Sequence, residues 1–80
     1  MYNKKMTKWT ILLNRYRFMH GISMNEMAKK VGITFANYHA IENCQRARPK
    51  METFKSISLE MNIPMEELQK IYYESYISKN

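Results

Sequence analysis

Apolar side chains recur along this chain every three or four residues, with charged and amide side chains between them. This period places the apolar residues on one side of an α-helix. Alternation of apolar and polar residues, the pattern of a half-buried strand, is nowhere sustained. We therefore predict an all-α fold with helices over residues 8–19, 24–31, 35–43, 51–61 and 65–76.

Residues at the predicted helix ends support these bounds. Three hydroxyl residues precede helices and can cap them: Thr7, Ser23 and Thr34. Glu26 follows Ser23 by three positions, which is the spacing of a capping box. Three residues that tolerate the left-handed conformation end helices: Gly21, Gly32 and Asn62.

The pattern also predicts which side of each helix is buried. In the first helix the inner side holds Trp9, Leu12, Leu13, Tyr16 and Met19, and in the fourth it holds Met51, Phe54, Ile57 and Met61. The third helix has only Tyr38 and Ile41 on its inner side. Its outer side is predicted to hold Phe35, Ala36, Asn37, His39, Ala40 and Asn43.

Length and composition limit the possible functions. Eighty residues allow one domain, which we divide into a basic arm (1–7), four helices (8–63) and a fifth helix with a tail (64–80). A single cysteine, Cys44, forms no internal disulfide and no cysteine-based metal site. No apolar run is long enough for a membrane span. We expect a cytoplasmic protein that is not an enzyme and needs no cofactor, since no nucleophile–base pair or metal cluster is visible.

Charge is distributed unevenly. Residues 1–50 carry ten Lys or Arg and two Glu, whereas residues 51–80 carry three Lys and five Glu. The whole chain has a formal net charge of +6. A basic first part with a mildly acidic tail favours one surface that meets a polyanion, with nucleic acid ahead of an anionic membrane.

The segment from Ser23 to Asn43 reads as a helix-turn-helix, with two capped helices joined at Gly32. Ala28 is small where the two helices would approach closely. From about Tyr16 to Leu68 the chain resembles the Cro and phage-repressor (XRE-type) helix-turn-helix family. The matching pieces, in register, are Arg17, Gly21, Ser23, Glu26-Met27-Ala28, Gly32-Ile33-Thr34, Ile41-Glu42, Pro49-Lys-Met-Glu-Thr-Phe54 and Ile63-Pro-Met-Glu-Glu-Leu68.

The resemblance implies a five-helix lambda-repressor-like domain that binds a specific sequence of double-stranded DNA, usually as a dimer. The second helix of the motif would enter the major groove. By position, the base contacts would be Phe35, Ala36, Asn37 and Ala40. Contacts to phosphates or the groove would come from Ser23, Met24, Asn25, His39, Asn43, Arg46, Arg48 and Lys50. The resemblance also implies a structural salt bridge between Arg17 and Glu42.

Some positions depart from the family pattern. Where Phe35, Ala36 and Ala40 stand, the family often has glutamine or another polar residue, and it usually has glycine in place of Cys44. Alanine and phenylalanine can pack on thymine methyl groups but form no bidentate hydrogen bonds. Asn37 is the expected bidentate reader of adenine, and the apolar side chains favour T-rich half-sites or recognition through DNA shape.

Apolar residues near the C-terminus exceed what one small core needs. We predict a two-fold dimer interface formed by Leu59, Ile71, Tyr72, Tyr76 and Ile77. These features together predict a dimeric repressor on a palindromic operator, of the phage, mobile-element or restriction-modification-controller type, with a possible protein antagonist or co-regulator. The alternative is an antitoxin, antirepressor or inhibitor that applies the apolar Phe35, Ala36 and Ala40 side to a protein partner.

Overall fold

The computed structural model describes residues 7–45 and 49–78, with side chains up to Tyr76. These residues form five helices and no strand. The helices are α1 (Lys8–His20), α2 (Met24–Val31), α3 (Phe35–Glu42), α4 (Met51–Met61) and α5 (Met65–Ser78). The all-α prediction is confirmed. Boundaries differ little from the predicted ones: α1 continues one residue further, α3 ends one residue earlier and α5 continues two residues further.

The helix ends follow from local hydrogen bonds. Thr7 Oγ1 accepts from the Thr10 N–H at 3.1 Å, and Thr34 Oγ1 accepts from the Asn37 N–H at 3.1 Å. Ser23 and Glu26 form both bonds of the capping box. Left-handed residues then close four helices: Gly21 after α1, Gly32 after α2, Cys44 shortly after α3 and Asn62 after α4.

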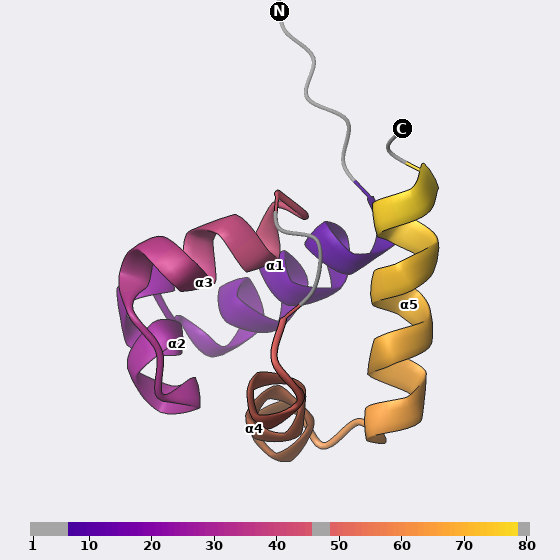
Figure 1. Cartoon of the computed structure of the whole chain (residues 1–80). Coiled ribbons are helices and arrows are strands. Elements are labelled where there is room, and N and C mark those ends of the chain that lie inside the picture. The colour runs from indigo at the N-terminus through magenta and orange to yellow at the C-terminus, as the bar shows by residue number, and fades with distance from the viewer. Residues whose placement is uncertain (1–6, 46–48, 79–80) are drawn as a thin grey trace, which may run out of the picture.

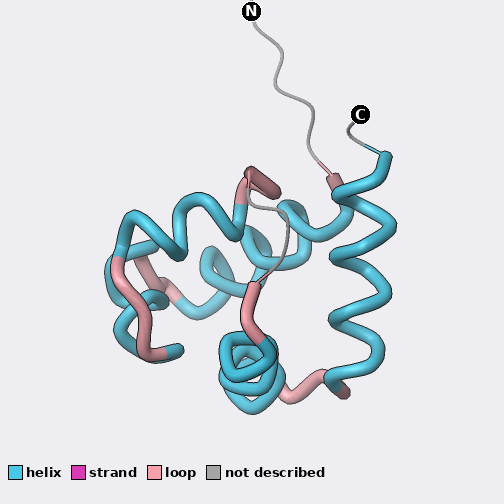
Figure 2. Tube along the Cα trace, in the orientation of Figure 1, coloured by secondary structure: helices cyan, strands magenta, loops and turns pink. Residues whose placement is uncertain are grey.

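Short turns bring the helices around one core (Figures 1 and 2). α2 packs against α3 and α4, while α1 packs against α3 and α5, and α4 against α5. The beginning of α1 lies beside the end of α5 (Figure 1), where the Trp9 N–H donates to Ser75 Oγ at 3.0 Å. No helix in the described part of the chain is long and apolar enough to span a membrane.

Three aromatic side chains form the centre of the core, and we call them the ring cluster: Trp9, Phe54 and Tyr72. The Trp9 and Tyr72 rings meet edge to face with centroids 5.0 Å apart, and Phe54 lies 5.8 Å from Tyr72 in a similar arrangement. All three are buried. Edge-to-face packing is a favourable geometry for aromatic pairs. The ring cluster therefore joins α1, α4 and α5 into one unit.

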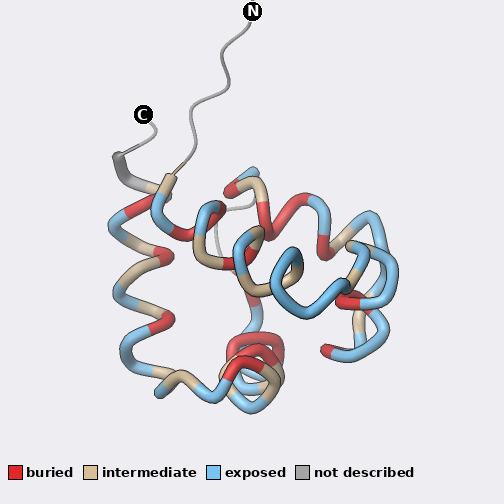
Figure 3. The backbone as a smooth tube through the Cα atoms, turned by 180° about the vertical axis from the view of Figure 1, so that it is seen from behind, coloured by how far each residue is buried: buried red, intermediate tan, exposed pale blue. Residues whose placement is uncertain are grey.

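Two methionines placed in the core by the sequence pattern are exposed. Met19, in the last turn of α1, is 76% exposed, and Met51, at the start of α4, is also exposed. Both lie at helix ends, where the inward side of the helix extends beyond the neighbours that could cover it. Figure 3 shows the buried positions concentrated where the helices face one another.

Candidate nucleic-acid interface

The turn between α2 and α3 fixes the angle between these two helices. Gly32 has a φ of +77°, and the Ile33 N–H donates to the Ala28 carbonyl at 3.0 Å. Ala28 is buried, and α2 packs on α3. A side chain with a Cβ is disfavoured at positive φ, so glycine allows this turn at the lowest cost. The pair is a helix-turn-helix with both helices capped.

The C-terminal half of α3 is held by polar bonds. Arg17 of α1 donates from Nε to Glu42 Oε1 at 2.9 Å and from Nη2 to Glu42 Oε2 at 2.8 Å. Tyr38 Oη also donates to Glu42 Oε1. The predicted partners Arg17 and Glu42 are thus brought together, with the Glu42 side chain fully buried. A bidentate pair of this kind is directional as well as strong.

Two further bonds join α1 to the backbone at the end of α3. Trp9 Nε1 donates to the Ile41 carbonyl at 2.9 Å, and Thr10 Oγ1 donates to the Glu42 carbonyl at 2.7 Å. We call the five residues that make these bonds the α3 clamp: Trp9, Thr10, Arg17, Tyr38 and Glu42. Sequence reasoning missed the roles of Trp9 and Thr10. The sequence predicts that Trp9 lies on the inward side of α1, but it does not predict which carbonyl accepts from the indole N–H.

Burial and hydrogen bonding shift the pKa values of two clamp residues. Burial raises the pKa of the Tyr38 hydroxyl far above its usual value, and the hydrogen bond to Glu42 raises it further. The hydrogen bonds to Glu42 raise the pKa of Arg17. The clamp therefore contains a neutral tyrosine and a charged arginine at ordinary pH, both bonded to the Glu42 side chain.

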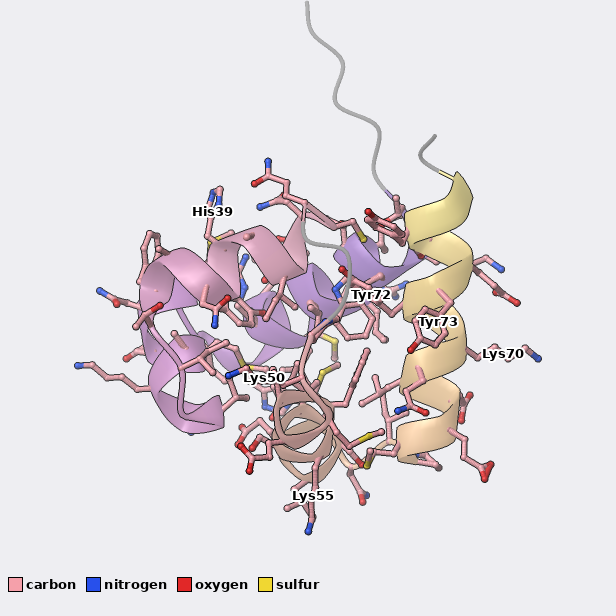
Figure 4. The ribbon with its side chains drawn as sticks, in the orientation of Figure 1. His39, Lys50, Lys55, Lys70, Tyr72 and Tyr73 are labelled. Carbon is pink, nitrogen blue, oxygen red and sulfur yellow. The ribbon has the colours of Figure 1, made fainter. Side chains whose placement is uncertain are left out.

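The N-terminal half of α3 leaves its outward side open. Phe35 is 47% exposed, Ala36 is exposed and Asn37 is half-buried. His39 projects away from the helix bundle (Figure 4), and its ring centroid is 5.9 Å from that of Phe35. This side therefore offers apolar surface interrupted by one carboxamide and one imidazole.

The predicted position of Ala40 on the outer side of the helix is wrong. Ala40 is only 9% exposed, so it lies on the inward side of α3 rather than among the outward residues. Positions 38, 40, 41 and 42 are all buried, which widens the inner side beyond the Tyr38 and Ile41 pair read from the sequence. The α3 clamp accounts for the burial of Tyr38 and Glu42, and Ala40 is buried although it takes no part in the clamp.

Residues at the beginning of α2 are divided between surface and core. Ser23 and Asn25 are exposed, whereas Met24 is half-buried and packs against the core. The Ser23 hydroxyl and backbone N–H are both engaged with Glu26. The unpaired N–H groups of the first turn of α2 remain as donors at a helix N-terminus, where negative charge is favoured.

The segment after α3 contains the remaining predicted contacts. Asn43 is half-buried and its Nδ2 donates to the His39 carbonyl at 2.9 Å. Lys50 is exposed at the start of α4 (Figure 4). Arg46 and Arg48 lie outside the described residues. In the sequence, Asn43 precedes the two arginines and Lys50 follows them.

The residues predicted for dimerisation divide into core and surface. Tyr72 is completely buried in the ring cluster, so its assignment to a dimer interface is wrong. Tyr72 was predicted to exceed the needs of the core, but its ring is part of that core. Leu59 is exposed, and Ile71 and Tyr76 are half-buried against the core. The side chain of Ile77 lies outside the described part.

The described residues contain no group of three His, Cys, Asp or Glu side chains that could hold a metal ion. Among families of known proteins, a helix-turn-helix domain family matches residues 10–74 of the chain. No curated protein and no solved structure gives a significant match. The family match covers α2, the turn, α3 and the helices that hold them. The chain therefore belongs to the XRE-type helix-turn-helix family of DNA-binding domains.

Proposed function

We propose that this protein is a transcriptional regulator that binds a specific sequence of double-stranded DNA and acts as a dimeric repressor of the phage, mobile-element or restriction-modification-controller type. One observation carries the proposal: α3 is fixed through its buried end while its other end is left open. An exposed helix held in one orientation is what insertion into the major groove requires.

The proposed base contacts are Phe35, Ala36 and Asn37, which are the outward residues of the first turn of α3. The Asn37 carboxamide suits a bidentate pair with adenine, worth about 1–3 kcal/mol of discrimination. Phe35 and Ala36 suit thymine methyl groups. Because Ala40 is buried, the readout depends on fewer side chains, which favours half-sites of A·T pairs and a contribution from DNA shape.

Phosphate binding is assigned to residues on both sides of α3. On one side lie Asn25 and the first backbone N–H groups of α2, including those near Ser23 and Met24. On the other side lie His39, Asn43, Arg46, Arg48 and Lys50. Cations that neutralise phosphates release counterions, so they make affinity depend on salt rather than on sequence.

Repression would follow from a dimer that occupies promoter DNA. Two copies related by a two-fold axis would place two α3 helices about 34 Å apart, on successive turns of one DNA face. Exposed Leu59 and half-buried Ile71 and Tyr76, with Ile77, are the proposed contact residues. Replacing Leu59 by serine is expected to reduce the dimer fraction in light scattering without unfolding the chain.

The central experiment is selection of bound duplexes from a randomised DNA library at two salt concentrations. We expect an enriched inverted repeat with A·T-rich half-sites. Asn37→Ala should change the enriched sequence, whereas Arg46→Ala/Arg48→Ala should weaken all duplexes and flatten the salt dependence. Binding without enrichment, lost at moderate salt for every duplex, would contradict sequence-specific recognition.

The apolar character of the open side of α3 favours a second candidate, in which the same side chains bind a protein. An antitoxin, antirepressor or inhibitor would bury Phe35 and Ala36 against its partner. Phe35→Ala would then abolish a stable protein complex while weak DNA binding survives. Enrichment of an operator that depends on Asn37 would exclude this candidate as the main function.

A further inference from the structure

A second apolar surface lies on α1, and the DNA-binding role proposed above makes no use of it. Met19 is 76% exposed, and Ile11, about two helical turns before it, has 40% of its surface exposed. Large apolar side chains that gather on a small protein are typical of an interaction site. We call this surface the α1 groove, and its cavity is defined below.

The α1 groove is a shallow cavity of about 470 Å³ between α1 and the end of α4. Ile11, Leu12 and Met19 form its α1 wall, and Met61 and Ile63 form the opposite wall. Leu12 and Ile63 are half-buried against the core, so the floor is fixed while the rim is open. A fixed apolar floor with flexible methionine at the edge can adapt to an inserted side chain.

The groove faces away from the proposed DNA-binding side. Thr10 and Arg17 of α1 bind α3, whereas Met19 lies on the opposite side of α1, because nine residues correspond to two and a half helical turns. α3 lies in front of α1 in Figure 1, and α1 lies in front in the reverse view of Figure 3. A partner in the groove would therefore leave the outward side of α3 free.

The charges around the groove are positive. Lys8 and Arg15 lie on its rim, and among the described residues neither has an ion-pair or hydrogen-bond partner. Tyr16 also lines the cavity, and its hydroxyl donates to Glu60 Oε2 at 2.9 Å. That carboxylate also faces Lys30 at 3.9 Å, so it is already engaged.

We propose that the α1 groove binds an acidic amphipathic helix of a different protein, a co-regulator that attaches while α3 holds DNA. An apolar stripe at positions i, i+3, i+4 and i+7 would fill the groove, and flanking Asp or Glu would face Lys8 and Arg15. A second copy of this chain is disfavoured, since two-fold pairing through this surface brings the same cations together. Residues 1–6 are disfavoured as occupants for a similar reason: they carry two lysines and no acidic residue.

The test uses the full chain and a phage-displayed library of 16-residue helical peptides. The library is selected on the wild-type protein in the presence of excess Ile11→Ser/Met19→Ser protein, which removes peptides that bind elsewhere. We expect enriched peptides with an apolar stripe flanked by Asp or Glu. They should bind the wild-type chain at least tenfold more tightly than the double variant. Lys8→Glu/Arg15→Glu should weaken them at least fivefold.

Matched controls separate this surface from the others. Leu59→Ser removes an equally exposed apolar side chain on α4 and should leave peptide affinity within twofold. The Ile11→Ser/Met19→Ser protein should keep wild-type helicity and thermal unfolding, because both side chains are exposed. Backbone amide shifts caused by the peptide should cluster in α1 and the end of α4, with α3 unmoved.

Four outcomes would overturn the proposal. The first is that no peptide survives the competitor, and the second is that the survivors lack acidic residues. The third is self-association of the wild-type chain that Ile11→Ser/Met19→Ser abolishes, which would make a second copy the occupant. The fourth is a tenfold gain in peptide affinity when residues 2–6 are deleted, which would make the N-terminal residues the occupant. Operator selection with the same double variant reports separately on DNA binding.

Discussion

α3 and α5 are both held against α1, but by different kinds of interaction. The α3 clamp consists of directed polar bonds from Trp9, Thr10 and Arg17 to the end of one short helix. α5 meets α1 through the ring cluster, together with a hydrogen bond from the Trp9 N–H to Ser75 Oγ. Apolar packing stabilises a helix without closely fixing its orientation, because it is non-directional. Paired hydrogen bonds stabilise the helix and also fix its orientation. The helix proposed to enter the major groove is thus the one with directed bonds.

Trp9 takes part in both arrangements. Its ring belongs to the ring cluster, and its indole N–H bonds to the end of α3. The two regions therefore share one side chain while differing in what they contribute. Substitutions on the α3 clamp should change both stability and DNA recognition, whereas substitutions in the ring cluster away from Trp9 should change stability alone.

The largest expected effect comes from Glu42→Ala. It leaves Arg17 and the Tyr38 hydroxyl without their shared acceptor, and breaking a buried ion pair costs about 3–5 kcal/mol. We expect the free energy of unfolding in urea to fall by this amount and operator affinity to fall at least tenfold. Glu74→Ala, an exposed acid on α5, is the matched control and should change stability by less than about 0.5 kcal/mol. Similar values for both variants would contradict the role of the clamp.

The next effect concerns α5. Tyr72→Leu removes the ring contacts with Trp9 and Phe54 while keeping an apolar side chain, and should cost about 2 kcal/mol of unfolding free energy. Operator affinity per folded molecule should stay within threefold. A loss of sequence preference with unchanged stability would show that α5 helps to aim α3, which would remove the contrast between the two regions.

Alkaline pH compares the two regions through their buried tyrosines. Burial raises the pKa of Tyr38 and of Tyr72 above the usual value near 10, with Glu42 adding to the shift at Tyr38. A raised folded pKa gives stability that is present below the unfolded pKa and lost as pH rises above it. The free energy of unfolding should therefore fall by about 1.4 kcal/mol for each of these tyrosines when the pH is raised from 8 to 11.

Urea unfolding of Tyr38→Phe and Tyr72→Phe at both pH values measures these contributions. Each variant should show a smaller alkaline loss than the wild-type chain, by about 1.4 kcal/mol. Tyr38→Phe also removes a hydrogen bond to Glu42, so it should be less stable than wild type at pH 8. An alkaline loss that neither substitution reduces would show that both hydroxyls titrate normally.

The smallest expected effect concerns the entry to α3, where the clamp does not reach. Thr34→Ala removes the acceptor of the Asn37 N–H and should cost about 1 kcal/mol of unfolding free energy. Thr34→Gly should cost only a few tenths, because glycine is tolerated at this position. Equal costs for alanine and glycine would contradict capping as the reason for threonine.

The sequence alone predicts the five helices, their caps and the turn at Gly32, because these depend on neighbouring residues. It is less informative wherever a residue's surroundings come from another helix. Ala40 follows the outward spacing of α3, yet only 9% of its surface is exposed. Tyr72 was counted as surplus because one helix cannot reveal that Trp9 and Phe54 leave a space for its ring. Arg17 and Glu42 were paired through resemblance, whereas Trp9 and Thr10 had no sequence signal for their carbonyl partners.

The left-handed backbone at Cys44 bears on how this position can change over evolutionary time. Its φ of +54° strains any residue with a Cβ by roughly 1–2 kcal/mol, while its thiol is fully buried beside Thr7 and fills space that glycine would leave empty. Losing a small buried side chain costs a comparable amount. Replacing this cysteine by glycine should therefore change the free energy of unfolding very little, so either residue can occupy position 44 as the sequence evolves. A larger side chain at position 44 would have the same backbone strain, and the space that the thiol fills would be too small for it.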